Sequence, residues 1–151
     1  MLGLDSSTGI EFENLVEPGF EVDADSEQLF RVLTNLGRNA MEAMQSDSES
    51  ALVRRLTISG ERTGAVCTIL VSDTGPGLPQ KARENLFSAF RGSARSGGTG
   101  LGLAIANELI RAHGGTIRLV ESTSGRTVFA ITIPDRPVRL DEVRQNLRRP
   151  A

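Results

Sequence analysis

Two glycine-rich stretches hold the residues whose types and spacing suit chemistry. The first, Asp73-Thr74-Gly75-Pro76-Gly77, directly follows an apolar run at residues 65–71 that predicts a strand. An acid at the end of a buried strand can accept a hydrogen bond from an amine, and leaving it unpaired would be costly. The two glycines let the backbone approach a flat or bulky group. Asp-x-Gly and Pro-Gly are also ordinary turn signals, so this stretch alone fits a simple tight turn equally well.

The second stretch, Gly97-Gly98-Thr99-Gly100-Leu101-Gly102, opens a predicted helix. Such a loop suits an anion, because free backbone N–H groups and the positive helix end both point at it. A P-loop is excluded, because it needs a lysine after its last glycine and the only lysine, Lys81, follows Gln80. The Rossmann fingerprint fits poorly, because Leu103 stands where its third glycine belongs. Kinase-type glycine loops precede a strand, whereas this one precedes a helix.

A third candidate lies on the clearest element, a helix predicted over residues 27–44 and capped by Asp25 or Ser26. Asparagines at positions 35 and 39 lie one turn apart and share a face with Glu42. Asparagine is a poor helix former, so local propensity does not explain the pair. A solvated polar face is the alternative. The neighbouring, core-facing stripe is expected to comprise Leu29, Val32, Leu33, Leu36, Ala40 and Ala43.

These residues need a scaffold, and the rest of the chain predicts one. Strands are expected at residues 10–16, 56–60, 65–71, 116–121 and 127–133, with a brief extended piece at 20–22. Helices are expected at residues 80–86 and 101–112, the second ending at Gly114-Gly115, and a short exposed helix at 140–147. The core stripe of the 101–112 helix is expected to comprise Leu101, Ile105, Leu109 and Ala112.

Composition excludes several classes of function. The 151 residues carry a net charge of −2, without the basic excess that nucleic-acid binding requires. A single cysteine, Cys67, permits no internal disulfide and no CxxC metal pair, and its place in a strand predicts a buried, inert thiol. No apolar run approaches 18 residues and no signal peptide opens the chain, so we expect no membrane contact by this chain.

Four blocks of the chain, in this order, resemble the motifs of one known family. Residues 35–40 (Asn-Leu-Gly-Arg-Asn-Ala) resemble the N box, and residues 73–77 the G1 box, of the ATP-binding catalytic domain of bacterial sensor histidine kinases. Residues 84–90 (Glu-Asn-Leu-Phe-Ser-Ala-Phe) resemble its F box, and residues 98–103 its G2 box. The resemblance covers about residues 10–134 and places the chain in the wider GHKL superfamily. One block would be weak support, but four in order are specific.

The resemblance implies a fold and a division of the chain. The fold would be a two-layer α/β sandwich, the Bergerat ATP-binding fold, with helices covering one face of a mixed, mostly antiparallel sheet. Residues 10–134 would form the ATP-binding domain. Residues 1–9 would be disordered or not native to the protein, and residues 135–151 would form a C-terminal tail.

The resemblance also implies a site for ATP and Mg²⁺. Asn39 would bind Mg²⁺ through its carbonyl oxygen, and Asn35 would stand beside the phosphates or the metal's water shell, which makes these two the expected catalytic residues. Asp73 would accept a hydrogen bond from the adenine amine, and residues 87–98 would form a lid. The residues expected around the nucleotide are Asn35, Asn39, Asp73, Gly75, Gly77, Leu78, Phe87, Phe90, Arg91, Gly98, Thr99, Gly100, Leu101, Gly102 and Leu103.

The chain departs from the family pattern in two respects, the residue at position 42 and the phospho-accepting histidine, because nothing in this sequence resembles the dimerisation domain that carries that histidine in the family. Glu42 stands where many members carry a basic residue that reaches a phosphate, so Arg91 or Arg95 would have to take that role. The only histidine, His113, precedes Gly114-Gly115 at a helix end that favours a partly positive ring. We expect His113 to be structural and not phosphorylated, so the acceptor histidine would lie outside this chain.

The resemblance therefore implies a catalytic domain that positions Mg-ATP for transfer of the γ-phosphate to a histidine on a dimerisation domain of the same or a partner protein. A response regulator would act downstream, and the location would be cytoplasmic, with membrane anchoring of the full kinase left open. Another GHKL ATPase or an anti-sigma serine kinase is an alternative, but these carry a glutamate where this chain has Asn35. The alternative from another class is a non-catalytic, nucleotide-dependent binding module.

Overall fold

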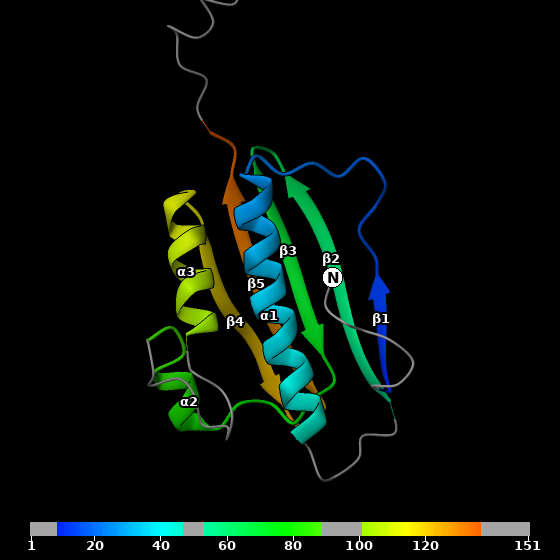
Figure 1. The fold of residues 1–151 in the computed structure, drawn as a ribbon. Coiled ribbons are helices and arrows are strands. Elements are labelled where there is room, and N and C mark those ends of the chain that lie inside the picture. Colours follow the sequence, from blue (N-terminus) through cyan, green and yellow to red (C-terminus); the bar gives the residue numbers. More distant parts are fainter. Residues whose placement is uncertain (1–8, 47–52, 89–100, 137–151) are drawn as a thin grey trace, which may run out of the picture.

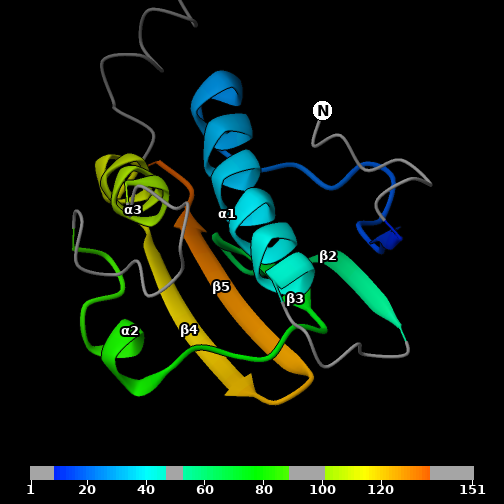
Figure 2. The ribbon, with the colours of Figure 1, turned by 60° about the horizontal axis from the view of Figure 1, so that its bottom comes forward.

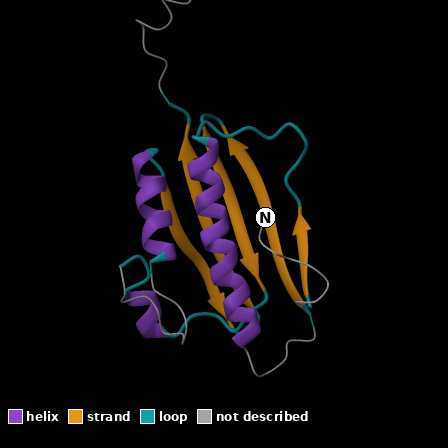
Figure 3. Cartoon of the chain, viewed as in Figure 1, coloured by secondary structure: helices purple, strands orange, loops and turns teal. Residues whose placement is uncertain are grey.

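The strands form one five-stranded sheet, and α1 and α3 pack against one of its faces (Figures 1, 2 and 3). The computed structural model describes residues 9–46, 53–88 and 101–136. The strands run in the order β1-β2-β3-β5-β4, with β1 parallel to β2 and every other pair antiparallel. The predicted mixed, mostly antiparallel α/β sandwich is confirmed. The elements are β1 (Ile10–Asn14), α1 (Ser26–Ser46), β2 (Arg54–Thr63), β3 (Val66–Asp73), α2 (Gln80–Glu84), α3 (Gly102–Ala112), β4 (Thr116–Thr123) and β5 (Arg126–Pro134).

The core lies between this face of the sheet and α1. Along β3, alternate residues are buried, ending with Asp73 at the end of the strand. The predicted stripe of α1 is confirmed: four of its members are buried, and Leu29 and Leu33 pack partly buried against them. The buried four are Val32, Leu36, Ala40 and Ala43. Asp25 caps the helix, because its Oδ1 accepts a hydrogen bond from the Gln28 N–H at 2.9 Å.

The core-facing stripe predicted for α3 is wrong, because the buried residues lie one position further along the helix than predicted. Ala106 and Ile110 are the buried residues of this helix, whereas Ala112 is exposed and Leu109 is only partly buried. Nearly every position from Leu101 to Ile110 is apolar or small, so periodicity alone could not select the face that meets the sheet. The contact between α3, α1 and the sheet makes that selection.

The ring of His113 joins the end of α3 to the start of α1. Its Nε2 accepts a hydrogen bond from the Asp25 N–H at 3.1 Å, and its Nδ1 lies 2.7 Å from the Leu109 carbonyl oxygen. A backbone N–H can only donate and a carbonyl can only accept, so Nε2 takes the acceptor role and Nδ1 the donor role in these two contacts. Both ring nitrogens are used inside the fold, which supports a structural role.

The piece at residues 20–22 is not a strand but part of the loop between β1 and α1. This piece contacts the end of β2. Arg62 donates a hydrogen bond to the Glu21 carbonyl at 2.9 Å. Phe20 packs so closely on Gly60 that a Cβ added to Gly60 would lie 2.9 Å from the Phe20 ring. Farther along, α2 ends at Glu84, before the predicted limit. The helix predicted at residues 140–147 lies outside the described residues.

In the part of the chain that the structure describes, no helix is both long and apolar enough to cross a membrane. Within the same residues, no group of three or more His, Cys, Asp or Glu side chains is placed to hold a metal ion. Cys67 is buried, as predicted.

Candidate functional site

Asp73 ends β3 near the middle of the sheet and is only 5% exposed. Its backbone pairs with Leu56 of β2 on one side and with Thr127 of β5 on the other. Its Oδ1 accepts a hydrogen bond from the Gly75 N–H at 2.8 Å. A buried carboxylate needs such partners, because desolvation penalises its charge. The sheet and this turn therefore fix the position of the acid.

The glycines that follow are required by the protein's own contacts. A Cβ on Gly75 would lie 2.8 Å from Asp73 Oδ1 and about as close to α1 as ordinary contact allows. Gly77 has φ +82°, and a Cβ there would lie 2.9 Å from the Thr123 carbonyl oxygen. The sequence predicts that the backbone at this turn approaches a flat or bulky group. The groups met in the structure are Asp73 itself and the strand end at Thr123, and contact with a nucleotide stays a prediction.

The side chain of Thr74 ties the start of this loop to β2. Its hydroxyl accepts a hydrogen bond from the Arg55 N–H at 3.0 Å and donates one to the Val53 carbonyl at 2.9 Å. The Thr74 N–H donates in turn to the Arg55 carbonyl at 3.2 Å. These bonds continue the pairing of β2 and β3 by one residue beyond Asp73. The carboxylate is therefore presented by rigid backbone.

Asn35, the first of the two helical asparagines, lies beside the start of α3. A Cβ added to Gly102 would lie 3.9 Å from the Cβ of Asn35. The Asn35 Nδ2 is buried and, within the described part of the chain, has no hydrogen-bond partner. Among those residues no side chain caps the first turn of α3 either. An unpaired amide beside a helix N-terminus is a place where an anionic ligand would be stabilised.

The other predicted site residues divide into two groups. Leu78 is buried, Phe87 packs partly buried against the core, and Leu101 and Leu103 flank the start of α3. The remainder, Phe90, Arg91, Arg95, Gly98, Thr99 and Gly100, lie outside the described residues, as does most of the predicted lid. The structure thus brings Asp73 together with Gly75, and Asn35 together with Gly102.

Sequence reasoning missed Thr127. Asp73 and Thr127 are the two buried polar side chains among the residues that the structure describes, each 5% exposed. They are direct partners in the register of β3 and β5, and their side chains point to the same face. The signal was a hydroxyl at an inward position of a strand whose other inward residues are Phe129, Ile131 and Ile133. Thr127 is therefore a further candidate for the site.

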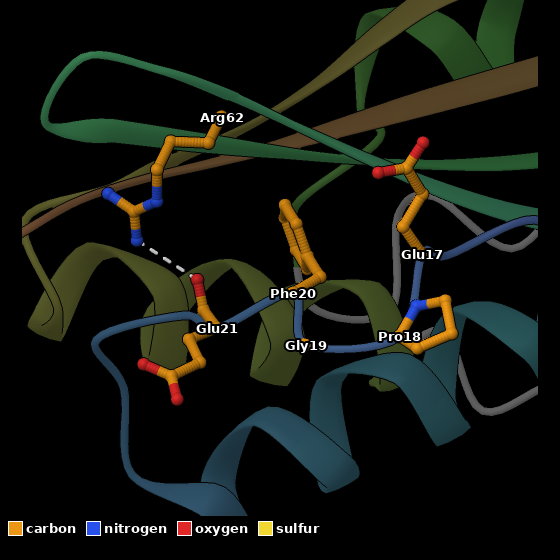
Figure 4. A pocket seen from close by; sticks show the side chains of 6 residues that line it. All are labelled: Glu17, Pro18, Gly19, Phe20, Glu21 and Arg62. Carbon is orange, nitrogen blue, oxygen red and sulfur yellow. Dashed lines mark hydrogen bonds between the residues drawn. The ribbon is translucent and has the colours of Figure 1, made fainter.

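A separate hollow of about 380 Å³ lies at the opposite end of β2, around Phe20 and Arg62 (Figure 4). The Arg62 guanidinium is already engaged, with Asp135 at 2.7 Å and with the Glu21 carbonyl. The hydrogen bond to Asp135 raises the pKa of Arg62. This arginine therefore fastens the loop before α1 to the end of β5, and we assign no ligand to the hollow.

Comparison with known proteins identifies the family. The profile of the family described as histidine kinase-, DNA gyrase B-, and HSP90-like ATPase matches residues 24–137. The sensory histidine kinase/phosphatase NtrB of Salmonella typhimurium is 40% identical over 121 residues, which are 77% of this chain and 34% of that protein. The chain therefore spans about a third of the length of this relative.

Solved structures agree with the sequence comparison. The mycobacterial sensor histidine kinase MprB is 32% identical, with a TM-score of 0.69 and 87% of each chain covered. Full-length ShkA in complex with AMPPNP is 26% identical, with a TM-score of 0.71, covering 88% of this chain and 27% of that one. With a buried acid at the end of a central strand and Asn35 beside the start of α3, the chain belongs to the histidine kinase-, DNA gyrase B- and HSP90-like ATPase family, as the ATP-binding domain of a sensor histidine kinase.

Proposed function

We propose that this domain binds Mg-ATP and presents the γ-phosphate to a histidine on a separate dimerisation domain, of the same or a partner protein. The observation that carries the proposal is the buried, unpaired Asn35 amide beside the uncapped first turn of α3, in the described part of the chain. Phosphoryl transfer asks a protein mainly for positioning and charge neutralisation. Unpaired donors held in a folded core are preorganised for that purpose.

At the adenine end, Asp73 accepts a hydrogen bond from the exocyclic amine. The acid is fixed by strand pairing on both sides, so little conformational entropy is lost on binding. Thr127, its neighbour on β5, adds a hydroxyl that can donate to or accept from the ring or a bridging water. Together the two side chains supply polar contacts for the base at the end of the central strands.

At the phosphate end, Asn39 supplies a carbonyl oxygen, a hard ligand of the kind that Mg²⁺ prefers. The residues fit Mg²⁺, because this ion keeps several of its waters and needs few protein ligands. Asn35 lies one turn away, and its Nδ2 can donate a hydrogen bond to such a water or to a phosphate oxygen. Bound Mg²⁺ supplies neutralisation of the developing charge on the phosphates. The amides at the start of α3 hold the phosphates in place, and Arg91 or Arg95 adds a cation.

The residue types favour transfer to histidine over hydrolysis. A neutral imidazole attacks phosphorus with its own lone pair, whereas water needs a base to orient it and take its proton. Asn35 stands where such a base would be placed, and an amide cannot accept that proton. We also infer a response regulator downstream and a cytoplasmic location, since the reaction consumes ATP.

The decisive experiment incubates the chain with γ-labelled ATP, Mg²⁺ and a histidine-containing dimerisation domain from the same kinase. We expect label on the acceptor histidine only when all three are present, and none on His113. ATP binding without any transfer to the acceptor would instead favour the nucleotide-dependent binding module.

Replacing Asn39 with alanine should weaken nucleotide binding specifically in the presence of Mg²⁺. The variant loses a metal ligand, whereas Asp73 and the adenine contacts remain. Calorimetric titration of ATP with Mg²⁺ and with EDTA measures both affinities. We expect the gain in affinity on adding Mg²⁺ to disappear in Asn39→Ala and to persist in Gln45→Ala, an exposed position of the same helix. Unchanged metal dependence would remove Asn39 from the metal site.

A further inference from the structure

The turn between β4 and β5 lies directly behind the loop that follows Asp73. Ser122 Oγ accepts a hydrogen bond from the Leu78 N–H at 2.8 Å. The Gly125 N–H donates to the Gly75 carbonyl at 2.9 Å. Between these two bonds, Gly77 approaches so closely that a Cβ would overlap the Thr123 carbonyl. We call residues 122–125 the hairpin clamp, because they contact both ends and the middle of the loop at residues 75–78.

Ser122 of the hairpin clamp and Asp73 belong to one row of paired residues that runs across the sheet. Ser122 pairs with Thr127, and Thr127 pairs with Asp73, so three polar residues stand in a row across β4, β5 and β3. The loop is fixed to Asp73 at its first residue, through the Gly75 N–H, and to Ser122 at its last, through the Leu78 N–H. The distance between the acid and the loop backbone is therefore set partly by Ser122.

We propose that Ser122 is a positioning residue: through the hairpin clamp it holds the loop at residues 75–78 at the spacing from Asp73 that distinguishes adenine from other bases. This rests on the proposed ATP site. Guanine carries a carbonyl oxygen where adenine carries its amine, so a carboxylate in a rigid pocket rejects it. Without the acceptor on Ser122, the Leu78 N–H must seek another partner and the loop relaxes away from the acid. A looser pocket loses selectivity as well as affinity.

The test compares the dissociation constants of the 151-residue chain for ATP and GTP by calorimetry. Ser122→Ala removes the acceptor, and losing one neutral hydrogen bond predicts a weakening of ATP binding by about three- to tenfold. We expect the ratio of the GTP to the ATP dissociation constant to fall by a similar factor. Ser122→Thr keeps the hydroxyl and should restore the ratio. Ser59→Ala, on the sheet face without helices, is the matched control and should change neither constant.

The outcomes separate the two proposals. If the unaltered chain does not bind ATP, the proposed function fails first. If it binds ATP and a folded Ser122→Ala variant keeps both the affinity and the ratio, the role of Ser122 is overturned. A purely structural role would lower the unfolding midpoint without changing the ratio, which also overturns it. Should Ser122→Ala not fold, hydrogen exchange of the unaltered chain decides: an unprotected Leu78 amide contradicts the clamp, and a protected one supports it.

Discussion

Replacing Asp73 with asparagine is expected to weaken ATP binding by about ten- to a hundredfold while leaving the fold intact. The asparagine keeps an amide oxygen, which can still accept the hydrogen bond from the Gly75 N–H. Its NH₂ group takes the place of the second carboxylate oxygen and can only donate. The adenine amine is also a donor, so an attractive contact becomes a repulsive one. Losing a charge-assisted hydrogen bond in a buried site costs about 1.5–3 kcal/mol, which gives the expected range.

Calorimetry with ATP measures this effect, and circular dichroism with a thermal melt verifies the fold. Glu61→Gln is the matched control, because it makes the same chemical change on an exposed acid toward the other end of β2. We expect its ATP affinity to match that of the unaltered chain. An Asp73→Asn variant that also binds ATP normally would remove Asp73 from the site.

The main scaffold could be predicted from local patterns. The stripe of α1 is strictly periodic, with polar residues between its apolar ones, so its buried face follows from the spacing of the apolar residues alone. The strand that ends at Asp73 could be located from its apolar run and the Gly-Pro-Gly that breaks it. In helix α3 apolar or small residues cover more than half of the circumference, so the spacing left a choice of face, and the predicted stripe does not coincide with the buried Ala106 and Ile110.

What could not be predicted depends on strand register. Thr127 and Ser122 are distant from Asp73 in sequence, and only the pairing of β3, β5 and β4 places the three on one rung. A shift of one residue in that pairing would turn every side chain to the opposite face, and no local pattern specifies the register of strands so far apart. His113 is a similar case. Its structural role rests on the Asp25 N–H, a partner that only the packing of α1 against α3 supplies.

Close packing explains the glycines better than flexibility does. The resemblance assigned Gly75 and Gly77 to the nucleotide, yet the structure already requires both without any ligand. A sequence shows that a residue must be small, but it does not show which protein or ligand atoms pack against it. The two roles are compatible, because a loop held tightly by its own protein is also a rigid wall for a base.

Gly115→Ala is expected to destabilise the chain by about 3 kcal/mol, at the upper end of overpacking effects. Gly115 joins α3 to β4 and is buried. A Cβ there would overlap the Thr132 carbonyl oxygen of β5 and come within 3.0 Å of the Ile110 side chain. Backbone cannot move aside by changing a rotamer, so either α3 or the edge strand β4 must shift. Urea unfolding should show a lower midpoint with an unchanged slope.

The neighbouring Gly114 provides the control for this substitution. Its φ is +74°, but the nearest atom to an added Cβ is Pro134 Cγ at 3.7 Å, an ordinary contact. Gly114→Ala therefore carries only the cost of a left-handed backbone, about 1–2 kcal/mol. We expect Gly115→Ala to unfold at a clearly lower urea concentration than Gly114→Ala. Equal midpoints for the two variants would mean that the chain can open at Gly115, and that the junction between α3 and the sheet is less tightly packed than its geometry indicates.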